Sequence, residues 1–160
     1  MPVLLRASTD PHKDVRFSIA QSLGTYNESV WEQEATYKEA TQNALLRLMD
    51  DEDSDVRDWA TFGIHSGNHN TSEAKAHLWK ALYDSDPDVR GEAAFGLVEF
   101  GDTFFTSLLR ELSCEEELME LYWEASSILG SSALLLDILH AVAEKRTPSN
   151  PPKPARKKSC

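Results

Sequence analysis

Hydrophobic positions along most of this chain recur three and four residues apart, the spacing that places side chains on one face of an α-helix. Val15, Ile19, Leu23 and Tyr26 follow this spacing, with mainly polar residues between them. Similar blocks, separated by turns, continue to about residue 146. The pattern predicts an all-α protein. The predicted helices span residues 3–9, 12–26, 30–50, 54–66, 72–84, 87–100, 103–113, 115–130 and 132–146.

An internal repeat underlies these helices. The tripeptide Asp-Val-Arg begins at Asp14, Asp55 and Asp88, with spacings of 41 and 33 residues, and a degenerate fourth copy is centred on Leu121. A unit of two helices in about 33 residues is typical of a stacked array of repeats. The extra residues between the first two copies are expected to lengthen one helix over residues 30–50, which would display Trp31 and Tyr37.

Each repeat carries helix-start signals. Asp10 and Asp86 are each followed by proline, which predicts an N-cap and a first helical residue. Ser29 and Glu32 fit a capping box. Within each Asp-Val-Arg, we expect the valine to pack inside, the aspartate to favour the helix N-terminus and the arginine to pair with a neighbouring repeat. A charged binding ladder is the less favoured interpretation.

The repeat resembles a known family. An acidic turn followed by Asp-Val-Arg and then by small residues and Leu or Ile is similar to the HEAT repeat, most of all to the short bacterial type related to phycobilin lyase subunits. The resemblance covers residues 3–130, and residues 131–146 add a closing helix. It implies a right-handed α-solenoid of about four HEAT-like helix pairs, with the second helix of each pair lining a concave face. The repeat domain would span residues 1–146.

The charge is distributed unevenly along the chain. The 160 residues carry a net charge of −11, but residues 145–160 hold six bases and no acid. Residues 1–144 therefore hold ten bases and 27 acids, a net charge of −17. A body this acidic repels phosphate backbones, so nucleic acid is not an expected partner. Residues 147–160, with four prolines and four bases, are predicted to be a flexible tail.

The composition also bears on location. No apolar run is long enough to span a membrane, and the apolar start is too short for a signal peptide. Cys114 and Cys160 are the two cysteines of the chain, which argues against a disulfide framework. We therefore expect a cytoplasmic protein. The first predicted helix is short and has no polar capping helix before it, so this apolar end is a candidate surface for another protein or a second copy of the chain.

No catalytic set or metal site is predicted. The acidic turn beginning at Asp51 lacks the glycine and glutamate of a calcium loop. His65 and His69 have the spacing of a helical zinc pair, but Gly67 and Asn68 should end the helix between them. Polar loop histidines are therefore the favoured interpretation. Cys114 is followed by three glutamates, which disfavour a reactive thiolate. We expect no cofactor.

One stripe beside the predicted core combines aromatic and acidic side chains. It lies three, six and ten residues after the repeat valine. The candidate partner-binding residues on or beside it are Asp58, Trp59, Phe62, Glu92, Phe95, Glu99 and Glu124. An aromatic patch rimmed by carboxylates suits a basic or amphipathic peptide. Helices inside a solenoid are buried on two sides, which favours the interpretation that Phe62 and Phe95 are core residues between repeats, and Trp59 is then the strongest candidate for binding.

These features favour a non-catalytic interaction module, such as a scaffold, an adaptor or an immunity-like protein, that binds a basic or amphipathic protein on its acidic concave face. The alternative is a tetrapyrrole (bilin) lyase-like enzyme or enzyme subunit, which the repeat type alone supports. A DNA-repair glycosylase is a third interpretation, but it would need a basic concave face.

Overall fold

The computed structural model describes residues 2–25 and 35–112 of the chain. These residues form helices and turns and contain no strand, which confirms the all-α prediction for this part of the protein. The helices are α1 (Pro2–Ala7), α2 (Lys13–Gly24), α3 (Ala35–Leu48), α4 (Ser54–Ser66), α5 (Ser72–Ala81), α6 (Pro87–Glu99) and α7 (Thr103–Leu112). No helix among them is long and apolar enough to cross a membrane.

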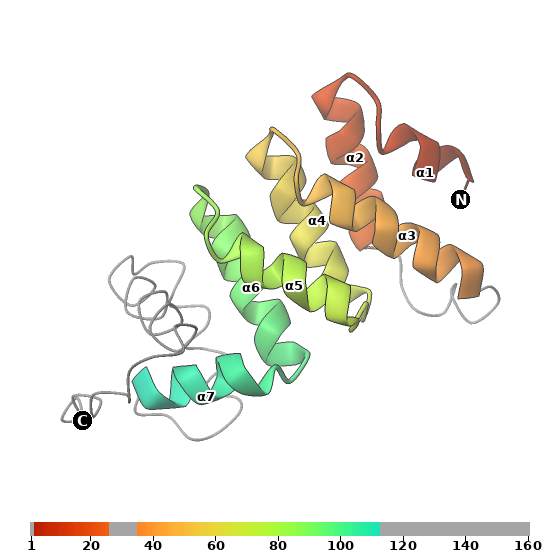
Figure 1. Ribbon diagram of the computed structural model, residues 1–160. Helices are drawn as coiled ribbons and strands as arrows, with labels where there is room; N and C mark the ends of the chain where they lie inside the picture. The colour runs from red at the N-terminus through yellow and green to blue at the C-terminus, as the bar shows by residue number, and fades with distance from the viewer. Residues whose placement is uncertain (1, 26–34, 113–160) are drawn as a thin grey trace.

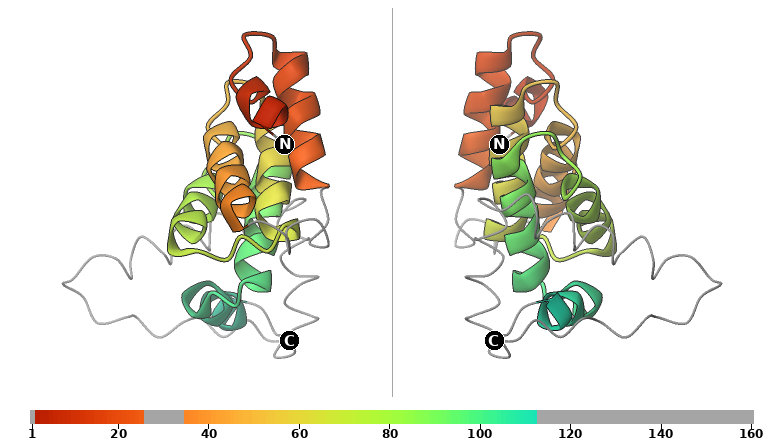
Figure 2. Two further views of the ribbon diagram at one scale, coloured as in Figure 1. Left: turned by 90° about the vertical axis from the view of Figure 1, so that its right-hand side faces the viewer. Right: turned by 90° about the vertical axis from the view of Figure 1, so that its left-hand side faces the viewer.

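The helices form two layers. α2, α4 and α6 lie side by side, and α4 packs between its two neighbours (Figure 1). α3 and α5 cover one face of this row, as the two side views in Figure 2 show. α1 packs against α2 and α3, and α7 follows α6 at the other end of the row. The opposite face of α2, α4 and α6 is not covered by α3 or α5.

Most predicted helix positions agree with the structure. α4 has the predicted bounds of residues 54–66, and α6 ends one residue before the predicted end. Residues 26–34 lie outside the described part of the chain, so the predicted start of the third helix, its capping box and Trp31 are not placed. The predicted helices 115–130 and 132–146, the tail 147–160 and Glu124 also lie outside it.

The two predicted Asp-Pro helix starts behave differently. Asp86 is the N-cap of α6, its side chain accepts a hydrogen bond from the backbone N–H of Asp88, and Pro87 follows it in the first turn. The prediction for Asp10 is wrong, because α2 begins at Lys13. The Asp10 carboxylate instead accepts the backbone N–H of His12 at 2.9 Å, which closes a turn before the helix begins.

The repeat columns form the core. Val56, Ala60 and Ile64 of α4 are fully buried, and so are the equivalent residues of α6, Val89, Ala93 and Leu97. The equivalent residue of α2, Val15, is only half-buried. Among the described helices, α2 lies at one end of the row, with only the short α1 beyond it. The expectation that the repeat valine packs inside is confirmed, with complete burial for Val56 and Val89 and partial burial for Val15.

The repeat arginines join one repeat to the next. Arg16 of α2 donates two hydrogen bonds to the carboxylate of Asp51, at 2.6 and 2.9 Å. Arg57 of α4 binds Asp84 in the same two-pronged way, with both distances 2.8 Å. Planar guanidinium groups suit this bidentate geometry. The predicted pairing of the arginine with a neighbouring repeat is therefore confirmed for these two copies.

Among the described residues, the third repeat arginine has no such carboxylate partner. Arg90 binds the carbonyl oxygens of Asp84 and Ser85, both at 2.9 Å, as Arg57 binds the carbonyl oxygens of its own turn. Its buried Nε atom has no hydrogen-bond partner. Within the described residues, the arginine–aspartate link therefore joins the first repeat to the second and the second to the third.

α2 and α4 approach each other closely at two glycines. A Cβ atom built on Gly63 would lie 2.9 Å from the Cα atom of Gly24 and 2.9 Å from the side chain of Leu45. The hydroxyl of Ser66 also donates a hydrogen bond of 2.8 Å to the carbonyl oxygen of Gly24. The absence of side chains here sets the distance between these two helices.

Candidate functional site

Aromatic rings form a continuous row across α2 and α4. Phe17 of α2 meets Trp59 of α4 edge to face, with ring centroids 6.4 Å apart. Trp59 then meets Phe62 at 5.5 Å, and Phe62 meets His65 at 5.4 Å, again nearly perpendicular. Edge-to-face contacts of this kind add to the stability that burial provides. Phe17, Trp59 and Phe62 are each half-buried, so the row is partly open to solvent.

His65 ends this row and connects α4 to α6. Its Nε2 atom lies 2.7 Å from a carboxylate oxygen of Glu92, and its Nδ1 atom lies 3.0 Å from one of Glu99. Only the doubly protonated ring donates from both nitrogens. Burial disfavours the charged ring, but the hydrogen bonds to the two glutamates outweigh it and raise the pKa of His65 to about 8. His65 is therefore mainly charged at pH 7.

The prediction that both histidines are polar loop residues is wrong for His65, whereas His69 does lie in the loop after α4, where it is buried. His65 lies inside α4 with 9% of its side chain exposed, and His69, just after the helix, is 1% exposed. Burial, with a smaller contribution from Lys38, lowers the pKa of His69 to about 4, so this ring is neutral at pH 7. The expected helix end at Gly67 and Asn68 is confirmed, since α4 ends at Ser66.

Asp58 has a different environment from the other acids of the predicted site. It is half-buried, and its buried Oδ1 atom accepts no hydrogen bond. Burial first, and then the negative charge of Glu92 and of other nearby acids, raises the pKa of Asp58 to about 6. At neutral pH this carboxylate is ionised where both desolvation and neighbouring charge oppose ionisation.

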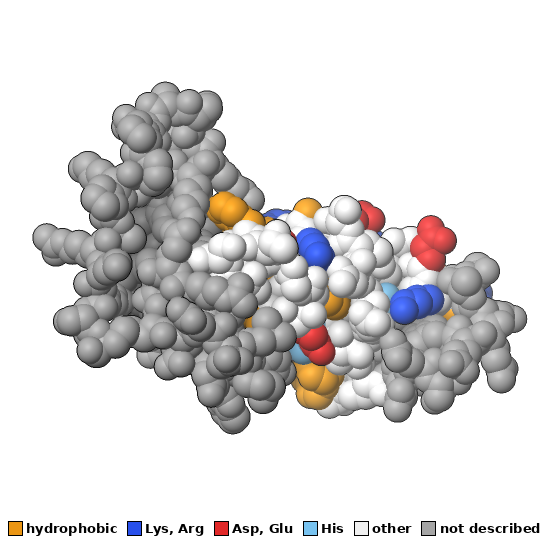
Figure 3. Space-filling model, turned by 90° about the horizontal axis from the view of Figure 1, so that it is seen from below, with side chains coloured by type: hydrophobic (Ala, Val, Ile, Leu, Met, Phe, Trp, Pro, Cys, Tyr) orange, Lys and Arg blue, Asp and Glu red, His pale blue; other side chains and the backbone are white. Residues whose placement is uncertain are grey.

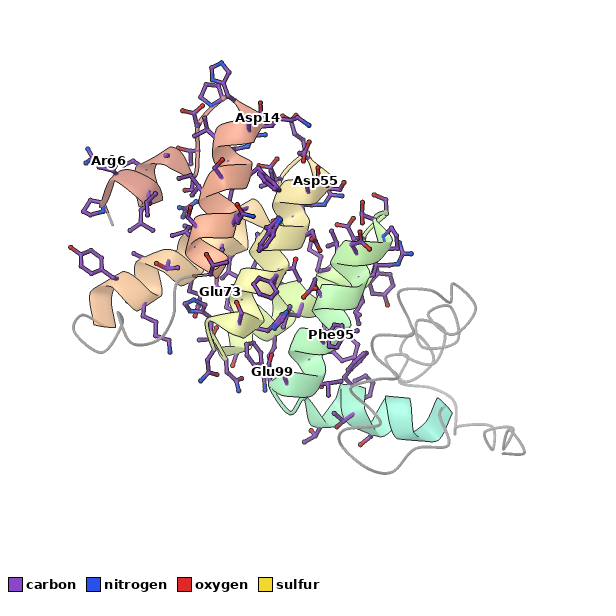
Figure 4. All side chains as sticks on the ribbon, turned by 180° about the vertical axis from the view of Figure 1, so that it is seen from behind. Arg6, Asp14, Asp55, Glu73, Phe95 and Glu99 are labelled. Atoms are coloured by element: carbon purple, nitrogen blue, oxygen red, sulfur yellow. The ribbon has the colours of Figure 1, made fainter. Side chains whose placement is uncertain are left out.

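The structure brings most of the predicted site residues onto one side of the helix row. The side chain of Glu92 is 27% exposed and that of Glu99 is 48% exposed. Phe95 is half-buried on α6, one turn before Glu99, as Figure 4 shows. Acidic and hydrophobic side chains lie next to one another at the surface in the view of Figure 3. Glu124 lies outside the described residues.

We call this region the aromatic–acidic face. It consists of Asp58, Trp59, Phe62, His65, Glu92 and Glu99. All of these residues except His65 are candidates from the sequence. His65 could have been predicted from its position in the repeat. It lies nine residues after Val56 and one turn after Phe62, beside the aromatic stripe.

The acidic turns hold the repeat arginines through Asp51 and Asp84, as described above. Burial opposes the ionisation of both carboxylates, but the hydrogen bonds from Arg16 and Arg57 outweigh it, so the pKa of each is lowered. In the part of the chain that the structure describes, no cluster of histidine, cysteine and acidic side chains is arranged to hold a metal ion.

A cavity lies apart from the aromatic–acidic face. It has a volume of about 370 Å³ and is lined by residues of the α3–α4 and α5–α6 turns and of α5, including Met49, His77 and Tyr83. Its charged lining residues are already paired, Arg57 with Asp84 and Lys80 with Asp50. None of the predicted site residues lines this cavity.

Comparison with known proteins gives a partial match. No family model matches the chain. The chain is 31% identical over 96 residues to Protein YibA of Escherichia coli strain K12, and it matches Protein YibA of Escherichia coli O157:H7 equally well. The match covers 60% of this chain and 34% of YibA, so the aligned region spans about a third of the relatives that it matches.

Proposed function

We propose that the protein is a non-catalytic interaction module, a scaffold, adaptor or immunity-like protein, that binds a basic or amphipathic protein segment on the aromatic–acidic face. One observation carries the proposal. Half-buried aromatic rings of α2 and α4 form a continuous row that ends at His65, where two partly exposed carboxylates of α6 meet it. Aromatic anchors bordered by charge are typical of protein interfaces.

We also propose that the repeats form a right-handed solenoid of the HEAT type, with this face on its concave side. The repeated arginine–aspartate link and the side-by-side row of α2, α4 and α6 support this arrangement. Stacked repeats offer extended surfaces to partners, and the net charge of residues 1–144 favours a basic partner. A second copy of the chain at the exposed α1 end, where Val3 is 71% exposed, is a further candidate partner.

The proposal is tested by recovering the partner. The full chain, tagged at its N-terminus, is used to purify bound proteins from its own source cell at low and at moderate salt. We expect one stoichiometric protein whose binding weakens as the salt concentration rises. Recovery of a coloured or small-molecule ligand with no protein partner would instead favour the bilin-lyase alternative.

A paired variant locates the binding surface. Trp59→Ala combined with Glu99→Gln removes one aromatic side chain and one charge from the aromatic–acidic face. The matched control, Tyr83→Ala with Glu73→Gln, makes the same two kinds of change at α5 and the turn after it, where Tyr83 is 54% exposed. We expect partner recovery to fall for the first pair and to persist for the second. Equal recovery with both pairs would place the interface elsewhere.

A further inference from the structure

The carboxylates of the aromatic–acidic face are not equivalent. Glu92 and Glu99 both contact His65, at 2.7 and 3.0 Å, and this cation already satisfies part of their charge. Asp58 lies on the same side of the helix row, and its Oδ1 atom is sealed from solvent without a donor. Buried polar atoms in native proteins nearly always have a partner, so an unpaired one calls for a physical explanation.

The neighbouring charges that act most strongly on Asp58 are of its own sign. Those that raise its pKa come from α6, from the turn before α6 and from α4 itself, namely Glu92, Asp88, Asp86 and Asp55. Water reaches this half-buried side chain only in part. The attraction of an incoming cation would offset the desolvation and the repulsion that act on this carboxylate.

Phe62 provides an apolar wall for such a cation. It lies four residues after Asp58, and residues at this spacing share one side of a helix. Its ring is half-buried between Trp59 and His65, which fixes its orientation. Lysine and arginine pack their apolar stems, and arginine also its planar head, against aromatic rings while the charge meets a carboxylate.

From this geometry we infer that Asp58 is the anchor for a basic side chain, arginine or lysine, of a protein partner, which inserts beside Phe62 and Glu92. The inference rests on the proposed function and identifies the group that the partner supplies. The chain also carries six bases in residues 145–160, a competing occupant in the same molecule. Including these bases still leaves a net charge of −11, so the protein retains a strong attraction for a basic partner.

The test uses a defined probe on the full chain. Binding of tetra-arginine amide is measured at pH 7.5 by NMR chemical-shift titration, with tetra-citrulline as the uncharged probe of similar shape. The variant is Asp58→Asn. The matched control is Asp14→Asn, which removes the same charge from an exposed position in the first turn of α2, as Figure 4 shows.

We expect Asp58→Asn to weaken tetra-arginine binding about fivefold or more, while Asp14→Asn changes it less than about twofold. Tetra-citrulline should bind neither protein measurably. Asp58→Asn should also raise the Tm at pH 7.5 by about 2–4 °C, because it removes an ionised carboxylate from an unfavourable position. A lower affinity for tetra-arginine together with a higher Tm in Asp58→Asn would indicate that this carboxylate serves binding at a cost to stability.

Three results would overturn the inference. Equal weakening by Asp58→Asn and Asp14→Asn would show that only net charge matters. A lower Tm for Asp58→Asn would show that the side chain has a structural role. A gain of about fivefold or more in affinity when Lys153, Arg156, Lys157 and Lys158 are changed to Gln in the full chain would show that this basic segment occupies the site.

The same data separate this inference from the proposed function. If a stoichiometric partner is recovered and its binding is unchanged by Asp58→Asn, the interaction module stands and the anchor is wrong. If tetra-arginine binds at Asp58 but no protein partner is recovered, the cation site stands and the proposed function is wrong.

Discussion

At the scale of single residues, His65 shows how one side chain joins two repeats. It comes from α4, and both of its hydrogen-bond partners come from α6. The charged ring lies between the carboxylates of Glu92 and Glu99. It therefore stabilises the folded chain as a cation and helps to hold α4 and α6 together. This role makes the stability of the protein depend on pH near neutrality.

We expect the free energy of unfolding to fall as the pH rises from about 6.5 to about 8. The pKa of His65 is raised from 6.5 to about 8 in the folded state, so its contribution is complete below about pH 6.5 and is lost as the pH passes through 8. The shift corresponds to about 2 kcal/mol. Urea unfolding at pH 6 and pH 8.5 measures the change.

His65→Gln should remove this pH dependence, whereas His77→Gln should keep it. His77 is half-buried on α5 and bonds to the carbonyl oxygen of Glu73, with no carboxylate partner among the described residues. If the two variants retained the same slope between pH 6.5 and 8, the link between His65 and its glutamates would not stabilise the fold.

The contact between two glycines gives a second prediction at this scale. Gly63→Ala should destabilise the protein by about 2 kcal/mol, because its Cβ would press on the backbone of Gly24 and on Leu45. Gly96→Ala is the control. Its Cβ would lie 3.0 and 3.1 Å from the terminal methyl groups of Leu78 and 3.2 Å from the Cβ of His65. These are side-chain atoms and none belongs to a backbone, and alanine favours the helix, so we expect a change within about 1 kcal/mol. Thermal unfolding distinguishes the two; equal losses would contradict the backbone explanation.

At the scale of the elements, the repeat arginines explain how successive helix pairs keep their register. Each guanidinium binds carbonyl oxygens of the turn before its own helix, and two of the three also bind the next acidic turn. The same residue therefore shapes its own turn and fixes the position of the next repeat. The acidic residues that resemble the start of a calcium loop are the other half of this link.

We expect Arg57→Ala to cost about 3 kcal/mol, because it leaves Asp84 as an unpaired and mostly buried acid, with both side chains only 13% exposed. Arg90→Ala should cost at least about 1 kcal/mol less, because Arg90 makes the same kind of carbonyl contacts without a carboxylate partner among the described residues. Denaturant unfolding of both variants measures the difference.

A double-mutant cycle of Arg57→Ala with Asp84→Ala should give a coupling energy above about 1 kcal/mol.

At the scale of the whole molecule, contacts are concentrated in the middle of the helix row. α4 packs against α2, α3, α5 and α6, whereas α1 has six residues and none of them is buried. In proteins built from repeats, stability is shared between neighbours, and the ends open first.

Native-state hydrogen exchange should therefore show a gradient of protection. We expect the amides of α4 to exchange most slowly and those of α1 most rapidly, with α2 and α6 between them. Mass spectrometry of exchanged peptides resolves these helices. Uniform protection from α1 to α6 would contradict the repeat-like distribution of stability and would favour a single cooperative core.

The sequence by itself determined which segments are helical and where several of them begin and end. Local signals decide these features, since hydrophobic spacing, Asp86 as an N-cap and Gly67 with Asn68 as a helix end act over a few residues. The repeat also predicted the pairing of Arg16 and Arg57 with the next repeat, because a residue recurring in register meets the same neighbour each time. For the same reason, the predicted site residues on α4 and α6 fall on one side of the row, and their role in binding a partner stays a prediction.

Only the tertiary structure decided what those side chains contact. The partners of His65 lie 27 and 34 residues away, and Gly24 meets Gly63 across two helices. Such contacts depend on the distance and rotation between neighbouring helices, which hydrophobic spacing does not specify. Glu92 pairs with His65, whereas Asp58 makes no ion pair among the described residues. This difference follows from the packing, because the neighbouring helices decide which groups a carboxylate meets.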